Sequence, residues 1–389
     1  MSMSESNKQF AEFFRELTGN EPLSWQERLF DRFVKEKDHE DQHHFPSVID
    51  LPTGLGKTMV MAIWLIARMQ RPDTIPTRLI YVVDRRTVVD QATDLAIKLQ
   101  KNYGKAKLAI STLRGQLADN REWSADPSRP AIIIGTVDLI GSALLFSGYR
   151  SSYKRRPLEA GLLGQDSLLV LDEAHLSKPF EKLITSISDY QKSSGKPMCI
   201  IRMSATSGES KFKPFQLIDS DFSDSTINQR FNAKKHLAIP PVVDPKKLNG
   251  TMADAAIALA KDQARKGKRI VVFVRKPDDA KTIAEAIRKH TVETVDDSGS
   301  KPKKVKTTPY VDLVEVLTGT MRGLERDELV KKPVFKDRWL NGDLQPDDPA
   351  NNKDPVFLIS TSAGEVGFDL NADHLVGDAA PLDSWIQRL

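Results

Sequence analysis

The stretch Ser47-Val-Ile-Asp-Leu-Pro-Thr-Gly-Leu-Gly-Lys-Thr58 decides the fold of this sequence. A short apolar run leads into a loop with two glycines, and a helical pattern follows over residues 59–68. Strand, loop and helix in this order are what a phosphate-binding loop requires. Leu51 occupies the place of the first glycine in the general pattern, but the Thr-Gly-x-Gly-Lys-Thr form is complete. The stretch therefore predicts a nucleotide site on an α/β sheet.

The residues of this loop have distinct expected roles. Gly54 and Gly56 allow backbone N–H groups to turn inward around the phosphates, and the start of the following helix adds the positive end of its dipole. Lys57 supplies a positive charge for the phosphates, and Thr58 is expected to ligate Mg²⁺. The predicted ATP-binding loop consists of Pro52, Thr53, Gly54, Leu55, Gly56, Lys57 and Thr58.

A second motif, Leu168-Leu-Val-Leu-Asp-Glu-Ala-His175, ends an apolar strand in two carboxylates. Phosphoryl transfer depends on positioning and charge neutralisation, so an acidic pair at a strand end suits the metal side of a phosphate loop. Asp172 is expected to hold Mg²⁺, and Glu173 to orient or deprotonate the attacking water. Together with Lys57, these two carboxylates are the predicted catalytic residues.

Apolar runs rich in Val and Ile alternate with helical patterns along the chain, which is typical of buried parallel strands in α/β proteins. The 389 residues exceed what one hydrophobic core usually organises, so two domains are expected. The proline-containing, weakly periodic segment 211–250 places the junction near residues 232–248. The predicted strands are 47–50, 79–84, 108–112, 131–136, 168–172 and 199–204 in the first half, and 270–275, 311–317, 356–360 and 374–378 in the second.

Composition narrows the class of protein. Lys and Arg total 57 against 53 Asp and Glu, so the net charge of +4 does not by itself indicate nucleic acid. The most apolar stretch, residues 59–69, is far shorter than the ~20 residues of a membrane helix, and the polar amino terminus does not resemble a signal peptide. We therefore expect a cytoplasmic protein with no membrane partner. The single cysteine, Cys199, is expected to be a buried thiol, and the Lys-rich tract 298–306 a solvated loop.

A third motif, Met203-Ser-Ala-Thr206, completes a set with the phosphate loop and the Asp-Glu-Ala-His motif. In this order the three motifs resemble those of a superfamily 2 helicase. The resemblance implies two tandem RecA-like domains with parallel sheets, which bind ATP and Mg²⁺. The residues that it implies to couple hydrolysis to domain movement are His175, Ser204, Ala205 and Thr206.

Other segments of the first half also resemble this family. Leu23-Ser-Trp-Gln-Glu-Arg28 is similar to the Q motif, which makes Gln26 the candidate for reading adenine; an exposed glutamine at a helix start is the alternative. Tyr81-Val-Val-Asp-Arg-Arg-Thr87 and Gly135-Thr-Val-Asp138 fall where the family contacts the nucleic-acid backbone. Such phosphate contacts give affinity without sequence preference. The expected DNA contacts of the first half are Arg85, Arg86 and Thr136.

Two segments of the second half narrow the resemblance. Leu317-Thr-Gly-Thr-Met-Arg-Gly-Leu-Glu-Arg-Asp327 and Ile359-Ser-Thr-Ser-Ala-Gly-Glu-Val-Gly-Phe-Asp-Leu370 are similar to the helicase subunit of type I CRISPR interference. The end of the chain, residues 373–389, is similar as well, so the resemblance spans about residues 20–389. It implies a DNA contact at Thr361 and nucleotide contacts at Gly364, Asp369, Gln387 and Arg388.

The sequence departs from that family in two respects. It ends at Leu389, before the arginine fingers that the family carries. Such arginines accelerate hydrolysis by ~10³–10⁵-fold in related enzymes. We therefore expect an incomplete second domain and weak ATPase activity. The family's nuclease is a His-Asp metal domain, and no His-Asp pair occurs among the seven histidines. The cluster of His39, His43 and His44 is expected to be a solvated loop, so no nuclease activity is predicted.

The resemblance implies an ATP-dependent translocase on single-stranded DNA, which unwinds target DNA after recruitment by an RNA-guided surveillance complex and feeds an HD nuclease domain. The expected organisation is an extension over residues 1–20 and RecA-like domains over 21–235 and 236–389. Two alternatives stay open. One is another superfamily 2 helicase, acting in DNA repair, restriction or on RNA; the other is a fragment that binds nucleotide and DNA with little turnover.

Overall fold

The chain divides into two compact units, Met1–Lys235 and His236–Leu389, in the computed structural model. Both units are built on parallel β-sheets. The residues that the structure describes are 5–35, 45–84, 86–104, 106–113, 122–149, 151–191, 195–204, 213–234, 236–239, 244–261, 269–296, 303–321, 325, 328–329, 331–332, 335, 338–339, 354–361 and 372–380.

The sheet of the first unit has six strands in the order β1-β6-β5-β2-β4-β3, and every neighbouring pair is parallel. The carboxyl ends of all six strands therefore lie at one edge of the sheet. The strands that carry the three motifs, β1, β6 and β5, are neighbours although they are far apart in sequence. The strands are β1 (Val48–Asp50), β2 (Arg78–Val83), β3 (Ala109–Leu113), β4 (Ala131–Thr136), β5 (Ser167–Leu171) and β6 (Cys199–Ser204).

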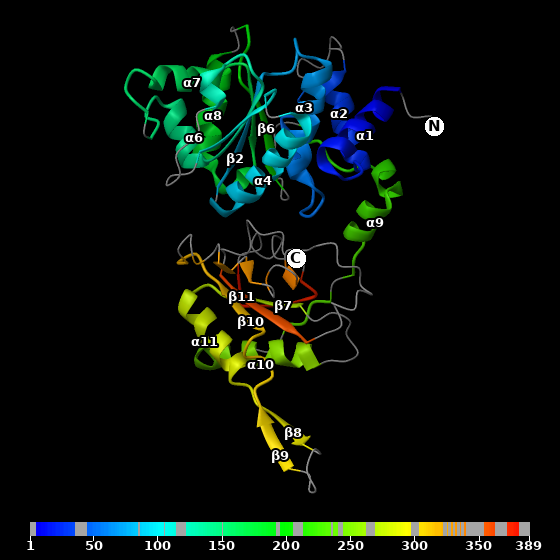
Figure 1. The fold of residues 1–389 in the computed structure, drawn as a ribbon, viewed down its shortest axis with the longest axis vertical. Helices are drawn as coiled ribbons and strands as arrows, with labels where there is room; N and C mark the ends of the chain where they lie inside the picture. The colour runs from blue at the N-terminus through cyan, green and yellow to red at the C-terminus, as the bar shows by residue number, and fades with distance from the viewer. Residues whose placement is uncertain are drawn as a thin grey trace. The chain divides into compact units, whose positions relative to one another are not determined.

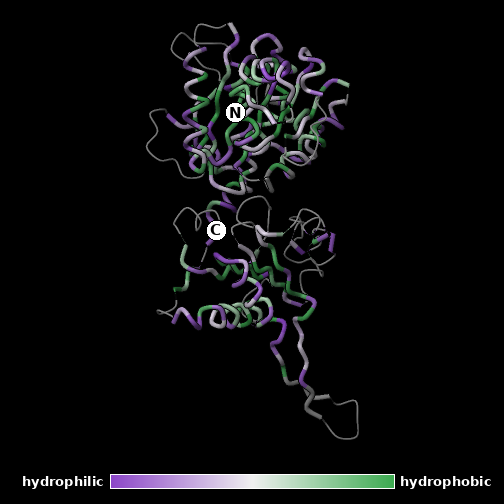
Figure 2. Tube along the Cα trace, turned by 90° about the vertical axis from the view of Figure 1, so that its left-hand side faces the viewer, coloured by the Kyte–Doolittle hydropathy of each residue, from purple (hydrophilic) through white to green (hydrophobic). Residues whose placement is uncertain are grey.

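Helices cover both faces of this sheet (Figure 1). Alternate strand residues point to opposite faces: Tyr81 and Val83 lie in one hydrophobic core, and Ile80 and Val82 in the other. Figure 2 shows the hydrophobic strands inside the unit and the hydrophilic segments around them. One layer holds α1 (Glu5–Thr18), α2 (Ser24–Val34), α3 (Val60–Gln70) and α4 (Arg86–Tyr103); the other holds α5 (Glu122–Ala125), α6 (Val137–Leu144), α7 (Arg156–Gly164) and α8 (Lys178–Tyr190).

Helix α1 is packed into the first of these cores. Phe10, Phe14 and Leu17 recur at helical spacing and are buried, and the ring of Phe10 stacks on Phe30 of α2 with centroids 4.3 Å apart. Residues 1–20 are expected from sequence to form an extension. From residue 5 onward the structure instead packs them against α2, α3 and α4, because the apolar stripe of α1 needs burial.

A return segment after β6 closes the first unit beside β1. The Phe215 N–H donates to the Val48 carbonyl at 2.8 Å, and the Asp50 N–H donates to the Phe215 carbonyl at 2.9 Å. Short helices then lead the chain out of the unit. They are η3 (Asp219–Ser223) and α9 (Ser225–Phe231). Two short helices earlier in the unit contain the last residues of the motifs: η1 (Lys57–Met59) ends the phosphate loop, and η2 (Ala174–Leu176) ends the acidic motif.

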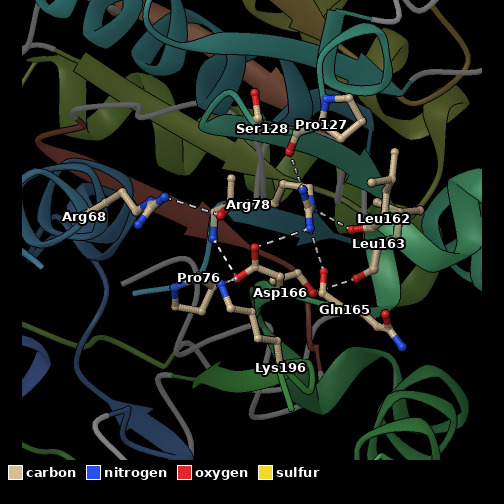
Figure 3. Close-up of polar contacts among 12 residues, drawn as sticks. Arg68, Pro76, Arg78, Pro127, Ser128, Leu162, Leu163, Gln165, Asp166 and Lys196 are labelled. Atoms are coloured by element: carbon tan, nitrogen blue, oxygen red, sulfur yellow. Dashed lines mark hydrogen bonds and ion pairs between the residues drawn. The ribbon is translucent and has the colours of Figure 1, made fainter. Parts of the chain in front are cut away.

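Buried Arg78 stabilises the amino-terminal edge of the sheet, opposite the edge where the motifs lie (Figure 3). Its guanidinium donates to the carbonyls of Leu162 at 2.8 Å, Pro127 at 3.0 Å and Gln165 at 2.9 Å, and it lies 3.7 Å from the Asp166 carboxylate. Burial lowers the pKa of Arg78, and Asp166 opposes that effect. These contacts tie two loops to the amino-terminal edge, away from the edge that carries the motifs.

The second unit has a parallel sheet of four strands in the order β10-β11-β7-β12. Ile270 and Val272 face one core, which α10 (Leu248–Lys261) and α11 (Pro277–Arg288) cover. The short helix η4 (Pro245–Lys247) leads directly into α10. Val271 and Leu358 face the opposite core, which Leu329, Phe335 and Trp339 complete. The strands are β7 (Arg269–Phe273), β10 (Val314–Leu317), β11 (Val356–Ser360) and β12 (His374–Gly377).

A two-stranded antiparallel hairpin also belongs to the second unit. It consists of β8 (Val292–Asp296) and β9 (Lys303–Thr307), with Glu293 paired opposite Lys306. The prediction of a loop over 298–306 is therefore wrong for its last residues, which form most of β9. A search of the sequence for apolar runs does not detect a strand as rich in lysine as β9.

The predicted fold class is confirmed. Each of the ten apolar runs overlaps a strand, and these strands form two parallel sheets covered by helices. Cys199 is only partly buried and packs at the margin of the first core, so the prediction of a buried thiol is wrong. Within the described ranges, no helix is long and apolar enough to cross a membrane.

Candidate nucleotide-binding site

The phosphate loop connects β1 to η1 and α3 at the carboxyl edge of the first sheet. Gly54 and Gly56 have φ angles of 78° and 71°, a region that other residues adopt only with strain. A Cβ on Gly56 would also lie 3.3 Å from the Gln26 side-chain nitrogen. Both glycines are thus required by the backbone path of the loop, as the sequence predicts.

Three successive carbonyls of the loop are each held by a side-chain donor. Trp25 Nε1 donates to the Leu55 carbonyl at 3.1 Å, and Gln26 Nε2 donates to the Gly56 carbonyl at 3.4 Å. Arg230 of α9 donates to the Gly54 carbonyl. In a planar peptide the following N–H points away from the carbonyl. Fixing these carbonyls therefore turns the N–H groups of the next residues to the other side, as phosphate binding requires.

Gln26 is buried beside the phosphate loop, so the alternative of an exposed glutamine at a helix start is wrong. It is 2% exposed, and its Oε1 accepts the Leu23 N–H at 2.9 Å, which caps the start of α2. With Nε2 on the Gly56 carbonyl, both ends of the amide are engaged within the protein. Gln26 therefore holds the phosphate loop, because its position in the capping box directs the side chain under the loop. Its contact with adenine stays a prediction.

The acidic motif brings its two carboxylates to the same edge. Asp172 follows β5, and its N–H donates to the Val82 carbonyl at 2.9 Å, which continues the ladder with β2. Glu173 has φ +48°, an uncommon value for a residue with a side chain, and its N–H donates to Asp172 Oδ1 at 3.1 Å. Burial, and then the neighbouring Glu173, raise the pKa of Asp172, while Lys57 opposes the rise.

A chain of polar contacts joins the three motifs. Lys57 Nζ lies 3.3 Å from Glu173 Oε1, and the two side chains are only 9% and 15% exposed. His175 Nδ1 lies 3.5 Å from Glu173 Oε2 and 3.3 Å from the Ser204 hydroxyl. The phosphate loop, the acidic motif and the Ser-Ala-Thr motif thus meet through side chains, because β1, β6 and β5 are neighbouring parallel strands.

Mg²⁺ is implied by this fold, and the side chains present fit it. Thr58 offers a hydroxyl and Asp172 a carboxylate, which are the oxygen ligands that Mg²⁺ prefers. The Tyr81 hydroxyl donates to Asp172 Oδ2 at 2.7 Å and is also hydrogen-bonded to Thr58, so it links the two. The described residues contain no group of three His, Cys, Asp or Glu side chains that could hold a metal.

Two of the residues predicted to contact DNA, Thr136 and Thr361, lie at strand ends in the structure. Thr136 is 6% exposed at the end of β4, and Thr361 is 5% exposed after β11. The Thr361 hydroxyl accepts the Gly319 N–H at 3.3 Å, so it is used inside the second unit. Both residues are buried because each follows or ends a strand that has a neighbour on each side. Their contact with DNA stays a prediction. The side chain of Arg86 and the whole of Arg85, Ala205, Thr206, Gly364, Asp369, Gln387 and Arg388 lie outside the described residues.

Sequence reasoning missed three residues that build the site. Tyr81 lies in the middle of a buried apolar strand, where an aromatic residue usually only fills the core. Trp25 lies next to Gln26 in the segment that resembles the Q motif. This position was the only feature of the sequence that could have indicated a role for Trp25 in the site. Arg230 is exposed on α9, in a segment where the sequence shows no motif.

Comparison with known proteins agrees with this architecture. Residues 20–209, which lie in the first unit, match the family model described as "Type III restriction enzyme, res subunit". None of the curated proteins matches the sequence.

Among solved structures, the DUF1998 helicase MrfA bound to DNA and AMPPNP matches 100% of this chain at a TM-score of 0.61 and 16% identity. This chain spans 49% of the MrfA chain. Mss116p bound to single-stranded RNA and AMP-PNP has a TM-score of 0.56 at 17% identity, over 99% of this chain and 69% of its own. Dbp5 of S. cerevisiae bound to RNA and ADP BeF3 has a TM-score of 0.53 at 15% identity, over 100% and 83%. The chain shares their fold of tandem RecA-like domains.

Proposed function

We propose that this chain is the ATP-hydrolysing motor of a superfamily 2 helicase. The observation that carries the proposal is the chain of contacts from Lys57 through Glu173 and His175 to Ser204. An acidic strand end that served only as a solvated cap would leave its carboxylates exposed. Here they are largely buried against a lysine, which is what positioning for phosphoryl transfer requires.

The side chains have separable parts in the proposed hydrolysis. Lys57 holds Glu173 through one carboxylate oxygen and moves toward the phosphates when they enter the loop. The other oxygen, Oε2, is buried 3.5 Å from His175 Nδ1 and makes no hydrogen bond among the described residues. We assign to this oxygen the proton taken from the attacking water. Thr58 and Asp172 would hold Mg²⁺, which neutralises charge on the phosphates. His175 and Ser204 transmit a change in the position of Glu173 to β6.

Two variants test this division of roles. Lys57→Ala removes the charge that attracts the phosphates, so binding of a fluorescent ATP analogue in Mg²⁺ buffer should weaken strongly. Glu173→Gln keeps the shape and an oxygen near Lys57 but removes the base, so it should bind the analogue normally and hydrolyse ATP about 10²–10⁴-fold more slowly. Normal hydrolysis by Glu173→Gln would contradict the role given to Glu173.

The proposed track of the motor is single-stranded DNA. Support comes from the family match of the first unit and from the shared fold with MrfA, a helicase bound to DNA. Mss116p and Dbp5 are bound to RNA, so a superfamily 2 RNA helicase is the second candidate. Competition between single-stranded DNA and RNA oligonucleotides of one sequence separates them. Preference for RNA would overturn the DNA proposal and leave the ATPase proposal intact.

The finer proposal is a role in type I CRISPR interference with an HD nuclease domain as partner. It rests on the resemblance of residues 317–327, 359–370 and 373–389. If it holds, an R-loop made by a type I surveillance complex should recruit this chain and stimulate its ATPase above the level given by the same DNA without the complex. Equal stimulation by both substrates would favour a repair or restriction helicase. Nucleotide and DNA binding with no turnover would favour the binding fragment.

A further inference from the structure

The connection between α6 and α7 exposes large apolar side chains in the first unit. Phe146, Tyr149 and Tyr153 are 57%, 68% and 85% exposed. Leu145 and Leu158 are exposed beside them in sequence. We call residues 145–158 the aromatic segment; all of it except residue 150 is described. Concentrated exposed aromatic area of this kind marks an interaction surface more often than isolated exposed residues do.

A buried carboxylate fixes the backbone of the aromatic segment. Glu159 is 7% exposed, accepts a hydrogen bond from the Ser151 hydroxyl, and lies 3.6 Å from Arg155 Nε. Arg155 also donates to the Ser124 hydroxyl at 2.9 Å. A Cβ on Gly148 would lie 3.4 Å from the same carboxylate, so the turn is packed closely on it. The aromatic side chains are therefore exposed from an anchored loop.

The charge around these aromatic residues is positive. Residues 145–158 contain Arg150, Lys154, Arg155 and Arg156 and no acidic residue. Arg155 is engaged by Glu159, but Lys154 is exposed and has no ion-pair partner in the part of the chain that the structure describes. Basic and aromatic residues adjacent in sequence match the two surfaces of an unpaired strand, namely its phosphates and its base faces.

We propose that the aromatic segment is a second contact for single-stranded nucleic acid, on which bases stack against Tyr149 and Tyr153 while Lys154 meets the phosphates. The segment begins after the eight-residue helix α6, which spans about 12 Å from the end of β4, where the first-unit DNA contacts are predicted. It lies on the α5–α8 side of the sheet, whereas the phosphate loop leads into α3 on the other side (Figure 1).

The choice of nucleic acid as the ligand rests on the proposed function, but the stacking of bases on the tyrosines is tested separately. Binding of a labelled oligothymidine to the full chain is followed by fluorescence anisotropy, beside an abasic oligomer that keeps the phosphates and lacks the bases. Stacking should make the wild-type chain prefer oligothymidine. The double variant Tyr149→Ala, Tyr153→Ala should lose about ten-fold affinity for oligothymidine per stacked base, with the abasic oligomer unaffected.

Matched controls separate stacking from general effects. Tyr190→Ala removes a tyrosine that is 90% exposed at the end of α8 and should leave both affinities unchanged. Tyr149→Trp, Tyr153→Trp should retain the preference for bases. Lys154→Ala should reduce the salt dependence of binding by about 0.7 in the slope of log affinity against log salt. Unchanged thermal unfolding of each variant shows that the fold is retained.

The outcomes separate this inference from the proposed motor. If the double alanine variant binds oligothymidine like the wild type, or if the wild type binds no oligonucleotide, the inference is overturned. Normal stimulation of the ATPase together with unchanged binding would leave the motor and assign the segment to a protein partner. Tyrosine-dependent binding without any stimulation of the ATPase would support the segment and count against the motor.

Discussion

Tyr81 shows how a single hydroxyl group organises the metal side of the site. It donates to Asp172 and is hydrogen-bonded to Thr58, the two side chains expected to hold Mg²⁺. Burial and the adjacent Asp172 carboxylate raise the pKa of Tyr81 well above its usual value, so the hydroxyl stays protonated as a donor at neutral pH. Such outer contacts fix the direction of metal ligands.

Replacement of Tyr81 by Phe gives a pH-dependent prediction. Its hydrogen bond stabilises the charged form of Asp172 and so lowers the pKa of a carboxylate that burial has raised. Without it, Asp172 takes up its proton at higher pH. The acid limb of kcat/KM for ATP should move upward by about one to two pH units, since a hydrogen bond to a charged group is worth roughly 1.5–3 kcal/mol. Tyr190→Phe is the control, and an unshifted acid limb in Tyr81→Phe would rule out this role.

The sequence locates the charged residues of the site but not the residues that orient them. Lys57, Asp172 and Glu173 occur in short motifs whose spacing reflects the chemistry, and the structure brings them together. Tyr81 and Trp25 act through one hydrogen bond each, and their apolar bodies are buried like those of any core residue. A pattern of apolar and polar positions contains no information on where a buried hydroxyl or indole N–H points.

At the scale of elements, α2 supports the phosphate loop through two adjacent residues. Trp25→Phe removes the donor to the Leu55 carbonyl but keeps most of the apolar packing. Leaving that buried carbonyl unpaired should lower the free energy of unfolding by about 1–3 kcal/mol and raise KM for ATP several-fold.

Trp64→Phe is the matched control, because Trp64 is equally buried and donates to the Pro76 carbonyl at 3.0 Å, away from the loop. It should cost similar stability in thermal unfolding without changing KM for ATP. Equal effects of both variants on KM would mean that Trp25 contributes stability alone.

Helix α9 makes the third contact with the loop. Arg230 is exposed, so Arg230→Ala should change the melting temperature little, because exposed contacts contribute little to stability. The Gly54 carbonyl loses its donor, and KM for ATP should rise. Gln229→Ala, on the same helix, is the control. An unchanged KM in steady-state ATPase assays of Arg230→Ala would exclude a contribution of α9 to nucleotide binding.

Elements differ in how far the sequence predicts them. Strands buried on both faces, such as β4 and β11, are continuous apolar runs and are predicted within about a residue. Hairpin strand β9 is Lys-rich and escapes that rule, since its pairing depends on the facing strand. Helix α1 shows apolar residues at helical spacing, but its packing on α2 depends on contacts that a local pattern does not specify.

At the scale of the whole molecule, topology makes one site out of distant segments. The phosphate loop and the Ser-Ala-Thr motif are separated by more than a hundred residues, yet β1 and β6 pair directly, with Asp50 opposite Ser204. Open parallel sheets gather ligand contacts at the carboxyl ends of their strands. The order of the motifs in sequence was sufficient to predict the fold class, whereas the neighbours of each strand follow only from the folded sheet.

The most direct test of the central claim is the steady-state rate of ATP hydrolysis by this chain with and without single-stranded DNA. A nucleic-acid motor should hydrolyse ATP faster when the strand is present, and Lys57→Ala should abolish the rate in both conditions. A rate that is the same with and without DNA, and with RNA in its place, would contradict the claim that this nucleotide site drives movement on nucleic acid.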